Sequence, residues 1–270
     1  MASPLSDLDR VEQVLAASPC GLFTDLDGTI SEIAPTPEEA RVSPVCRERL
    51  REIAARLPLV AVISGRSAQE ARQMVDVPGI VYVGNHGLEY LFDDTLTVRE
   101  DALEYVGRIA AVLERAKRLL KVEGILLENK GVSASLHYRL SPDPDQAKIA
   151  ILSLLRRLSE ARGLRVTEGR MVVELRPPMA VHKGTSVKHL IASHKLRGAI
   201  YIGDDTTDLD AFRTLREFSR GAAFHNLTVA IASPEAPPEL VAEADYALSS
   251  VVEMECFLSW LADYLARPGS

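Results

Sequence analysis

The feature that most limits the fold is a series of short apolar segments, each followed at once by a polar or glycine-rich turn. Continuous apolar segments at 59–63 and 80–83 have the length and composition of strands buried on both faces. A third apolar segment ends just before Asp25, and helical patterns at 43–57 and 68–75 separate the segments. This alternation predicts an α/β fold with a doubly wound parallel sheet. We expect the functional site at the carboxyl ends of these strands.

A different pattern begins near residue 98 and suggests an inserted domain. It reads helix-strand-strand twice, with helices at 100–120 and 145–162 and strands at 124–130, 132–140, 164–168 and 171–176. This repeat predicts a four-stranded, largely antiparallel sheet with two helices on one face. The first pattern then resumes with a buried strand at 198–202. We therefore predict a core formed by 1–98 and 179–270, interrupted by an α+β domain at 99–178.

Two carboxylates follow the first buried strand. Asp25 and Asp27 are two residues apart, so on an extended chain they point the same way. Two anions held together are unfavourable unless a cation lies between them. Gly28 would let a phosphate approach the backbone, and Thr29 adds a hydroxyl. This stretch favours metal-assisted phosphoryl transfer with a carboxylate nucleophile; the alternative is an ordinary acidic turn.

Polar side chains also end, or lie next to, the other predicted core strands. Ser64 ends the second strand, Lys183 precedes the helix after the insertion, and Asp204, Asp205 and Asp208 follow the last strand. Taken singly, these residues have simpler explanations: a turn, a solvated lysine and acids that favour a helix N-terminus. Together at one sheet edge they predict a phosphate site with a bound cation, a nucleophile, a neutral donor and a fixed positive charge.

Composition limits the partners and the compartment. The 270 residues carry a net charge of −7, which argues against non-specific binding to nucleic acid or to an anionic membrane. The three cysteines are odd in number and lack metal-binding spacing, so we expect reduced thiols in a cytoplasmic protein. We expect no signal peptide, and no apolar run is long enough to span a bilayer. We expect a monomer or a weak dimer.

These motifs, in this order, resemble the haloacid dehalogenase superfamily of phosphatases and, more narrowly, the trehalose-6-phosphate phosphatases. The matching motifs are Asp25-Leu26-Asp27-Gly28-Thr29, Ser64-Gly65-Arg66, Gly84-Asn85-His86-Gly87-Leu88-Glu89, Glu128-Asn129-Lys130-Gly131, His137-Tyr138-Arg139, Glu174-Leu175-Arg176-Pro177, Lys183-Gly184 and Gly203-Asp204-Asp205-Thr206-Thr207-Asp208. The resemblance covers about residues 20 to 215. It implies a haloacid dehalogenase-like core with a C2-type cap. One departure is Leu209, where the family usually carries Glu.

The resemblance implies a phosphatase that works through an aspartyl phosphate and uses Mg²⁺. Asp25 would attack phosphorus, and Asp27 would protonate the leaving sugar oxygen and then activate water. Asp208 is expected either near the metal or as a partner of Lys183. The implied catalytic residues are Asp25, Asp27, Ser64 and Lys183; the implied metal site contains Asp25, Asp27, Asp204, Asp205 and Asp208; the implied substrate contacts in the core are Gly28, Thr29, Arg66, Asn85 and His86.

The strands of the inserted domain have one apolar and one polar face. In 132–140 apolar residues alternate with Ser133, Ser135, His137 and Arg139. The polar face could simply be solvated, as in many antiparallel sheets. Its mixture of acids, bases and hydroxyls also suits sugar hydroxyls. The resemblance implies that Glu128, Lys130 and Glu174 hold the disaccharide, with His137 and Arg139 as further candidates.

The expected reaction is hydrolysis of trehalose 6-phosphate to trehalose and phosphate. Two alternatives stay open. One is a phosphatase for another glycosyl phosphate: sucrose phosphate, mannosyl-3-phosphoglycerate or glucosylglycerol phosphate. The other is a non-catalytic sugar phosphate sensor, which the presence of Asp25, Asp27 and Lys183 disfavours. A panel of phosphorylated sugars would separate these possibilities.

Overall fold

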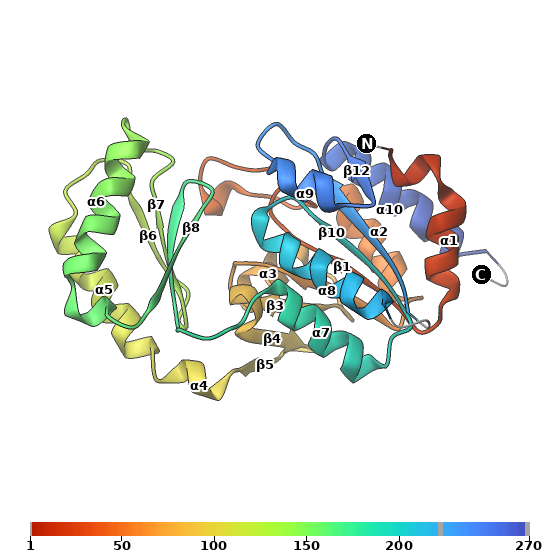
Figure 1. The fold of residues 1–270 in the computed structure, drawn as a ribbon, viewed down its shortest axis with the longest axis horizontal. Helices are drawn as coiled ribbons and strands as arrows, with labels where there is room; N and C mark the ends of the chain where they lie inside the picture. Colours follow the sequence, from red (N-terminus) through yellow and green to blue (C-terminus); the bar gives the residue numbers. More distant parts are fainter. Residues whose placement is uncertain (1, 221–223, 268–270) are drawn as a thin grey trace. The chain divides into compact units, whose positions relative to one another are not determined.

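The computed structural model describes residues 2–220 and 224–267, and it divides the chain into two compact units. Unit 1 comprises Met1–Ala34, Ala40–Thr97 and Val181–Ser270, and unit 2 comprises Pro35–Glu39 and Val98–Ala180. Each unit has a sheet of its own (Figure 1).

Unit 1 is built on an eight-stranded sheet in the order β12-β11-β10-β1-β2-β3-β4-β5. The strands are β1 (Cys20–Thr24), β2 (Leu59–Ile63), β3 (Val81–Gly84), β4 (Glu89–Phe92), β5 (Thr95–Val98), β10 (Gly198–Gly203), β11 (His225–Ile231) and β12 (Tyr246–Leu248). Pairing is parallel from β12 to β3, and β4 runs antiparallel to β3. The predicted doubly wound sheet is confirmed. The register sets Thr24 opposite Ile202 and Val62, so β1, β10 and β2 end together.

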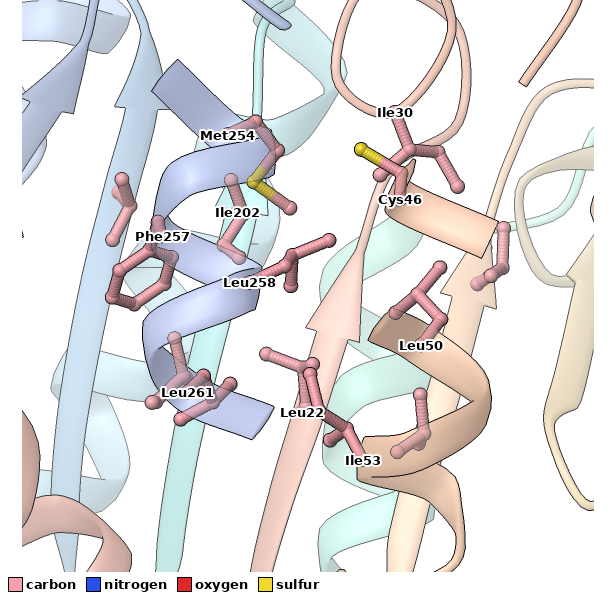
Figure 2. Packing of buried hydrophobic residues seen from close by; sticks show 14 of the residues in the cluster. Leu22, Ile30, Cys46, Leu50, Ile53, Ile202, Met254, Phe257, Leu258 and Leu261 are labelled. Carbon is pink, nitrogen blue, oxygen red and sulfur yellow. The ribbon is translucent and has the colours of Figure 1, made fainter. Parts of the chain in front are cut away.

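Helices cover both faces of this sheet because neighbouring strand residues point to opposite sides. The helices of unit 1 are α1 (Leu8–Ala16), α2 (Pro44–Ala54), α3 (Ala68–Val75), α7 (Lys183–His194), α8 (Leu209–Ser219), α9 (Pro238–Glu243) and α10 (Val251–Leu265). Leu22 belongs to the core cluster of α1, α2, α3 and α10, whereas Phe23 belongs to that of α7 and α8. In Figure 2, side chains of α2 and α10 face each other with Leu22 between them. Truncating a fully buried leucine of this kind costs about 2–5 kcal/mol of stability.

Capping residues mark the starts of α2 and α3. The Ser43 hydroxyl accepts the Cys46 N–H, and Pro44 occupies the first turn of α2. Ser67 and Glu70 form a capping box at the start of α3. These caps fix where α2 and α3 begin.

Unit 2 contains a four-stranded antiparallel sheet in the order β6-β7-β9-β8. Its elements are α4 (Glu100–Leu103), α5 (Val106–Leu119), β6 (Leu126–Asn129), β7 (Ala134–His137), α6 (Pro144–Arg157), β8 (Arg165–Gly169) and β9 (Val172–Arg176). Residues of α5 and α6 form one core with Ala134, Leu136, Val173 and Leu175 of the sheet. The predicted sheet with helices on its apolar face is therefore confirmed.

Several local predictions are wrong. The single helix expected over 100–120 is two helices, because the chain departs from the α-helix between Leu103 and Val106. The strand expected over 132–140 ends at His137, and Leu140 is exposed. The hairpin of β4 and β5 was not expected.

Cys20, Cys46 and Cys256 are free, in keeping with the expected thiols. Among the residues that the structure describes, no helix combines the length and apolar character needed to cross a membrane.

Candidate active site

The centre of the site in unit 1 is a buried lysine between two aspartates. Asp25 directly follows β1, and its N–H donates to the Ile202 carbonyl of β10 at 2.9 Å. Lys183 is the first residue of α7, where the sequence placed it just before the helix. Its Nζ lies 2.8 Å from Asp25 Oδ1 and 2.7 Å from Asp208 Oδ1. The lysine is thereby fixed with its charge beside the predicted nucleophile.

Asp208 is the most fully bonded carboxylate of this cluster. Its Oδ1 accepts hydrogen bonds from Lys183 and from the Tyr201 hydroxyl, both at 2.7 Å. Its Oδ2 accepts the N–H groups of Asp204 and Asp205, each at 3.0 Å. Four donors match the acceptor capacity of a carboxylate. Of the two roles expected for Asp208, the geometry favours the partner of Lys183 over the metal ligand.

Tyr201 also belongs to this cluster, although no sequence motif indicates it. It lies within the apolar run of β10 and is fully buried. A buried phenol almost always has a hydrogen-bond partner, and this one has Asp208. The sequence feature that could have indicated this role is a single tyrosine in an otherwise apolar strand.

Asp204 and Asp205 have different surroundings although they are adjacent. Asp204 is buried beside Gly28, where an added Cβ would lie 2.0 Å from Asp204 Oδ2. Gly28 has φ +82°, so a larger residue would be both strained and in collision with this carboxylate. Asp205 instead accepts the Thr206 N–H at 2.7 Å and caps the 3₁₀ turn Thr206–Asp208. Capping, and not burial in the cluster, is therefore the structural role of Asp205.

The cluster holds more negative than positive charge. Asp25, Asp204 and Asp208 each place one oxygen within 4.8 Å of the others, and the ammonium that bridges Asp25 and Asp208 is that of Lys183. Burial raises the pKa of Asp25 well above its usual range; Lys183 opposes this effect, and the charges of Asp208 and Asp204 add to it. This arrangement fits a bound divalent cation, with Asp25 and Asp204 as the carboxylates best placed to ligate it.

Lys183 and Tyr201 respond to the same charges. Burial alone would lower the pKa of Lys183, but Asp208 and Asp25 raise it overall, so the side chain stays cationic. Burial raises the pKa of Tyr201 well above its ordinary value, and the charge of Asp208 raises it further. Tyr201 therefore remains a neutral hydrogen-bond donor to Asp208.

Asp27, the predicted acid and base, is paired with Arg66. The guanidinium makes two bonds to the carboxylate, from Nε to Oδ2 at 2.7 Å and from Nη2 to Oδ1 at 2.8 Å. This two-point geometry is the strong form of an ion pair. The Asp27 side chain is 32% exposed and that of Arg66 12%, so the pair lies at the edge of the site. Arg66, predicted to contact phosphate or sugar, is held here by Asp27.

Ser64 directly follows β2 and is buried next to the turn that contains Asn85 and His86. The Asn85 N–H donates to the Arg66 carbonyl at 2.7 Å, and the His86 N–H donates to the Ser64 carbonyl at 3.0 Å. The ring of His86 covers Gly65, where an added Cβ would lie 2.7 Å from Nε2. Asn85 and His86 thus support the loop that carries Ser64 and Arg66.

Two further residues of the matching motifs have definite positions. Glu89 is buried, and its carboxylate accepts the Ala68 N–H at the start of α3 at 2.8 Å. Thr29 is fully buried, and its Oγ1 has no hydrogen-bond partner among the described residues. An orphaned hydroxyl beside the Asp25 loop suits a ligand that brings its own donors and acceptors.

Unit 2 groups some of its candidate sugar contacts on the polar face of its sheet. Glu128 of β6 bonds His137 Nε2 of β7 at 2.7 Å, and Lys130 Nζ lies 3.5 Å from the same carboxylate oxygen. Glu174 of β9 lies opposite Ser135 in the sheet register. Arg139 lies beyond the end of β7, so it is not part of the sheet face on which the sequence placed it.

Comparison with known proteins connects both units to one family. The sequence model of the trehalose-phosphatase family matches residues 23–248. The chain is 34% identical over 215 residues to the trehalose-phosphate phosphatase of Mycobacterium tuberculosis, covering 77% of this chain and 54% of that protein. It is 37% identical over 216 residues to an uncharacterized glycosyl hydrolase of M. tuberculosis, covering 77% of this chain and 16% of that protein. The chain spans about half the length, or less, of these curated relatives.

A solved structure with the same fold is the C-terminal domain of C. albicans trehalose-6-phosphate phosphatase. It aligns with a TM-score of 0.76 at 19% identity, over 95% of this chain and 98% of that chain. The likeness supports the haloacid dehalogenase-like architecture of a parallel core sheet with a second, antiparallel sheet.

The family match begins in β1, two residues before Asp25, and ends with β12. It therefore includes the Asp25–Lys183–Asp208 cluster and the whole polar face of unit 2. Since it extends over most of the sequence, the chain belongs to the trehalose-phosphatase family.

Proposed function

We propose that this protein is a Mg²⁺-dependent phosphatase that hydrolyses trehalose 6-phosphate to trehalose and phosphate. The observation that carries the proposal is the buried cluster of Asp25, Lys183, Asp204 and Asp208, which combines a nucleophile, a fixed cation and a set of carboxylates for a metal. The substrate follows from the family and from the names of the relatives.

The reaction would proceed in two steps, formation and hydrolysis of an aspartyl phosphate. In the first, a carboxylate oxygen of Asp25 bonds to phosphorus while the bond from phosphorus to the sugar oxygen breaks, and Asp27 gives its proton to the departing sugar. In the second, Asp27 takes a proton from water, the water oxygen bonds to phosphorus, and the aspartyl phosphate bond breaks. Both aspartates return to their starting states and inorganic phosphate leaves.

Fixed positive charge assists both steps. Lys183 and the Ser64 hydroxyl would hold phosphate oxygens as charge spreads over them, and Asp208 keeps Lys183 in place. Arg66 would be a further phosphate or sugar contact, and its two bonds hold the Asp27 carboxylate in place. The Thr29 hydroxyl and the backbone at Gly28 are further contacts for phosphate oxygens.

The metal site would use the Asp25 and Asp204 carboxylates and the Asp27 backbone carbonyl. When bound there, Mg²⁺ would neutralise the excess negative charge of the cluster and polarise the phosphoryl oxygens. Asp205, which caps the following turn, and Asp208, which is fully bonded, would support this site without ligating the ion.

The inserted domain, residues 99–178, would determine specificity. Glu128, Lys130 and Glu174 would bind the sugar hydroxyls, with His137 orienting Glu128 and Arg139 as a further contact. The core, residues 1–98 and 179–270, would carry out the phosphate chemistry. This division of labour explains why ionisable groups gather on one face of the unit 2 sheet.

The test is phosphate release from a panel of phosphorylated sugars, with Mg²⁺ and with EDTA. Trehalose 6-phosphate should have the highest kcat/KM, and EDTA should abolish turnover. If the enzyme instead prefers one of the alternatives, that compound is its substrate: sucrose phosphate, mannosyl-3-phosphoglycerate or glucosylglycerol phosphate. Binding of trehalose 6-phosphate without phosphate release would point to a sensor.

A further inference from the structure

One cross-strand row on the unit 2 sheet contains two carboxylates and two hydroxyls in alternation. Glu128 of β6 pairs with Ser135 of β7, Ser135 with Glu174 of β9, and Glu174 with Thr167 of β8. Residues opposite one another in register point to the same face of a sheet. Their strand neighbours Leu136, Val173 and Leu175 point into the core with α5 and α6, so the row lies on the opposite, polar face.

Both hydroxyls of the row are buried without a partner. Ser135 is 1% exposed, and neither its Oγ nor Thr167 Oγ1 has a hydrogen-bond partner within the described part of the chain. A hydroxyl can donate one hydrogen bond and accept others, and leaving it buried and unbonded costs free energy. Native proteins satisfy most such groups, so two in one row point to a ligand.

The alternation matches the hydrogen-bonding needs of sugar hydroxyls. A carboxylate only accepts, so each sugar hydroxyl that donates to Glu128 or Glu174 still needs a donor for its own lone pairs. Ser135 lies between these two glutamates, and Thr167 lies on the other side of Glu174. Each can donate a hydrogen bond to the sugar hydroxyl that itself donates to the neighbouring glutamate.

We infer that Ser135 and Thr167 are specificity-determining residues that bind hydroxyls of the sugar moiety together with Glu128 and Glu174. The sugar site then extends over all four strands of the unit 2 sheet. This inference rests on the proposed function, because it assumes a glycosyl phosphate substrate.

The test compares Ser135→Ala and Thr167→Val with two matched controls. Thr167→Val keeps the shape and removes the hydroxyl, whereas Thr167→Ser keeps the hydroxyl and should retain most activity. Ser153→Ala removes an exposed hydroxyl from α6 and should behave as wild type. Each variant is assayed with trehalose 6-phosphate and with p-nitrophenyl phosphate, which has no sugar, and its thermal unfolding is recorded.

For Ser135→Ala and Thr167→Val we expect kcat/KM for trehalose 6-phosphate to fall roughly tenfold or more, mainly through KM. The reason is that removing the protein hydroxyl leaves the sugar hydroxyl that it bound unpaired. Turnover of p-nitrophenyl phosphate should stay within about twofold of wild type. Equal losses for both substrates, or no loss for either, would overturn the inference while leaving the proposed function intact. Failure of the wild type itself to hydrolyse trehalose 6-phosphate would overturn both.

Discussion

Lys183 and Asp208 form a buried ion pair of 2.7 Å in which the aspartate has no acceptor capacity left for another group. Two of its four hydrogen bonds tie it to the backbone at Asp204 and Asp205. The third bond comes from Tyr201 and the fourth from Lys183. Asp208 therefore connects the end of β10 to Lys183, and we propose that it positions this lysine for the reaction.

Removing the Tyr201 hydroxyl tests this relationship. Tyr201→Phe should lower stability by about 1.5–3 kcal/mol, the range for a hydrogen bond to a charged group. It should also lower kcat roughly tenfold with little change in KM, because Lys183 is less firmly held. Thermal unfolding and steady-state kinetics measure the two effects. Tyr246→Phe, which removes a hydroxyl bonded to Asp7 outside the site, should lower stability alone. Normal kcat in Tyr201→Phe would contradict the positioning role.

Asp204 and Asp205 should differ in their effect on the metal requirement. Asp204→Asn removes a buried carboxylate of the cluster and should raise the Mg²⁺ concentration for half-maximal activity about tenfold to a hundredfold. Asp205→Asn keeps a side-chain oxygen that can cap the following turn, so its Mg²⁺ dependence should stay close to wild type. Titration of EDTA-treated enzyme with Mg²⁺ gives both values. Equal effects of the two substitutions would contradict the assignment.

Cysteine reactivity tests the fold of unit 1. Burial raises the pKa of Cys20 and of Cys46 to about 12 from an ordinary 9.0, whereas Cys256 is exposed. At pH 8 both buried thiols are protonated and covered, so iodoacetamide should modify Cys256 alone. Mass spectrometry should find one adduct on the native protein and three after denaturation. Cys256→Ser should remain unmodified when native; labelling of Cys20 or Cys46 as fast as Cys256 would contradict the packing.

Substitutions on the unit 2 sheet should separate sugar recognition from phosphate chemistry. Glu128→Ala or Glu174→Ala should lower kcat/KM for trehalose 6-phosphate by roughly one to three powers of ten, since each removes a charged hydrogen-bonding group. Hydrolysis of p-nitrophenyl phosphate should change much less. Lys183→Ala should reduce both activities alike, and Glu123→Ala, on an exposed residue of unit 2, should reduce neither. Equal losses for both substrates in the Glu128 and Glu174 variants would assign the polar face a structural role.

Much of the fold was predictable because apolar runs and helix caps determine single strands and helices without help from distant residues. The run 59–63 is apolar throughout and coincides with β2, and the predicted helix 68–75 coincides with α3, which Ser67 and Glu70 cap. The break in the expected helix 100–120 was not predictable, since neither Gly nor Pro stands at Glu104 and Tyr105. The β4–β5 hairpin turns at Asp93 and Asp94, which both have positive φ. Aspartate tolerates this conformation, but the pair lacks the glycine that usually marks such turns.

The site was predictable as a set of residues and not as a set of contacts. Apolar strands followed by acids indicate which side chains gather at the sheet edge, because parallel strands end together. The partners depend on distances across the sheet. The sequence separates Arg66 from Asp27 by 39 residues and Tyr201 from Asp208 by 7, and neither spacing indicates a bond. Asp204, Asp205 and Asp208 look alike in the sequence, and only their bonded neighbours distinguish a metal candidate, a cap and a positioning residue.

The most direct test of the account is phosphate release from trehalose 6-phosphate by the wild type and by Asp25→Asn, each with saturating Mg²⁺. The wild type should release phosphate and trehalose in equal amounts. Asp25→Asn, which loses the attacking oxygen with little change in volume, should be slower by at least about a thousandfold. Asp9→Asn, on an exposed residue of α1, should match the wild type. Turnover by Asp25→Asn near the wild-type rate would contradict the account.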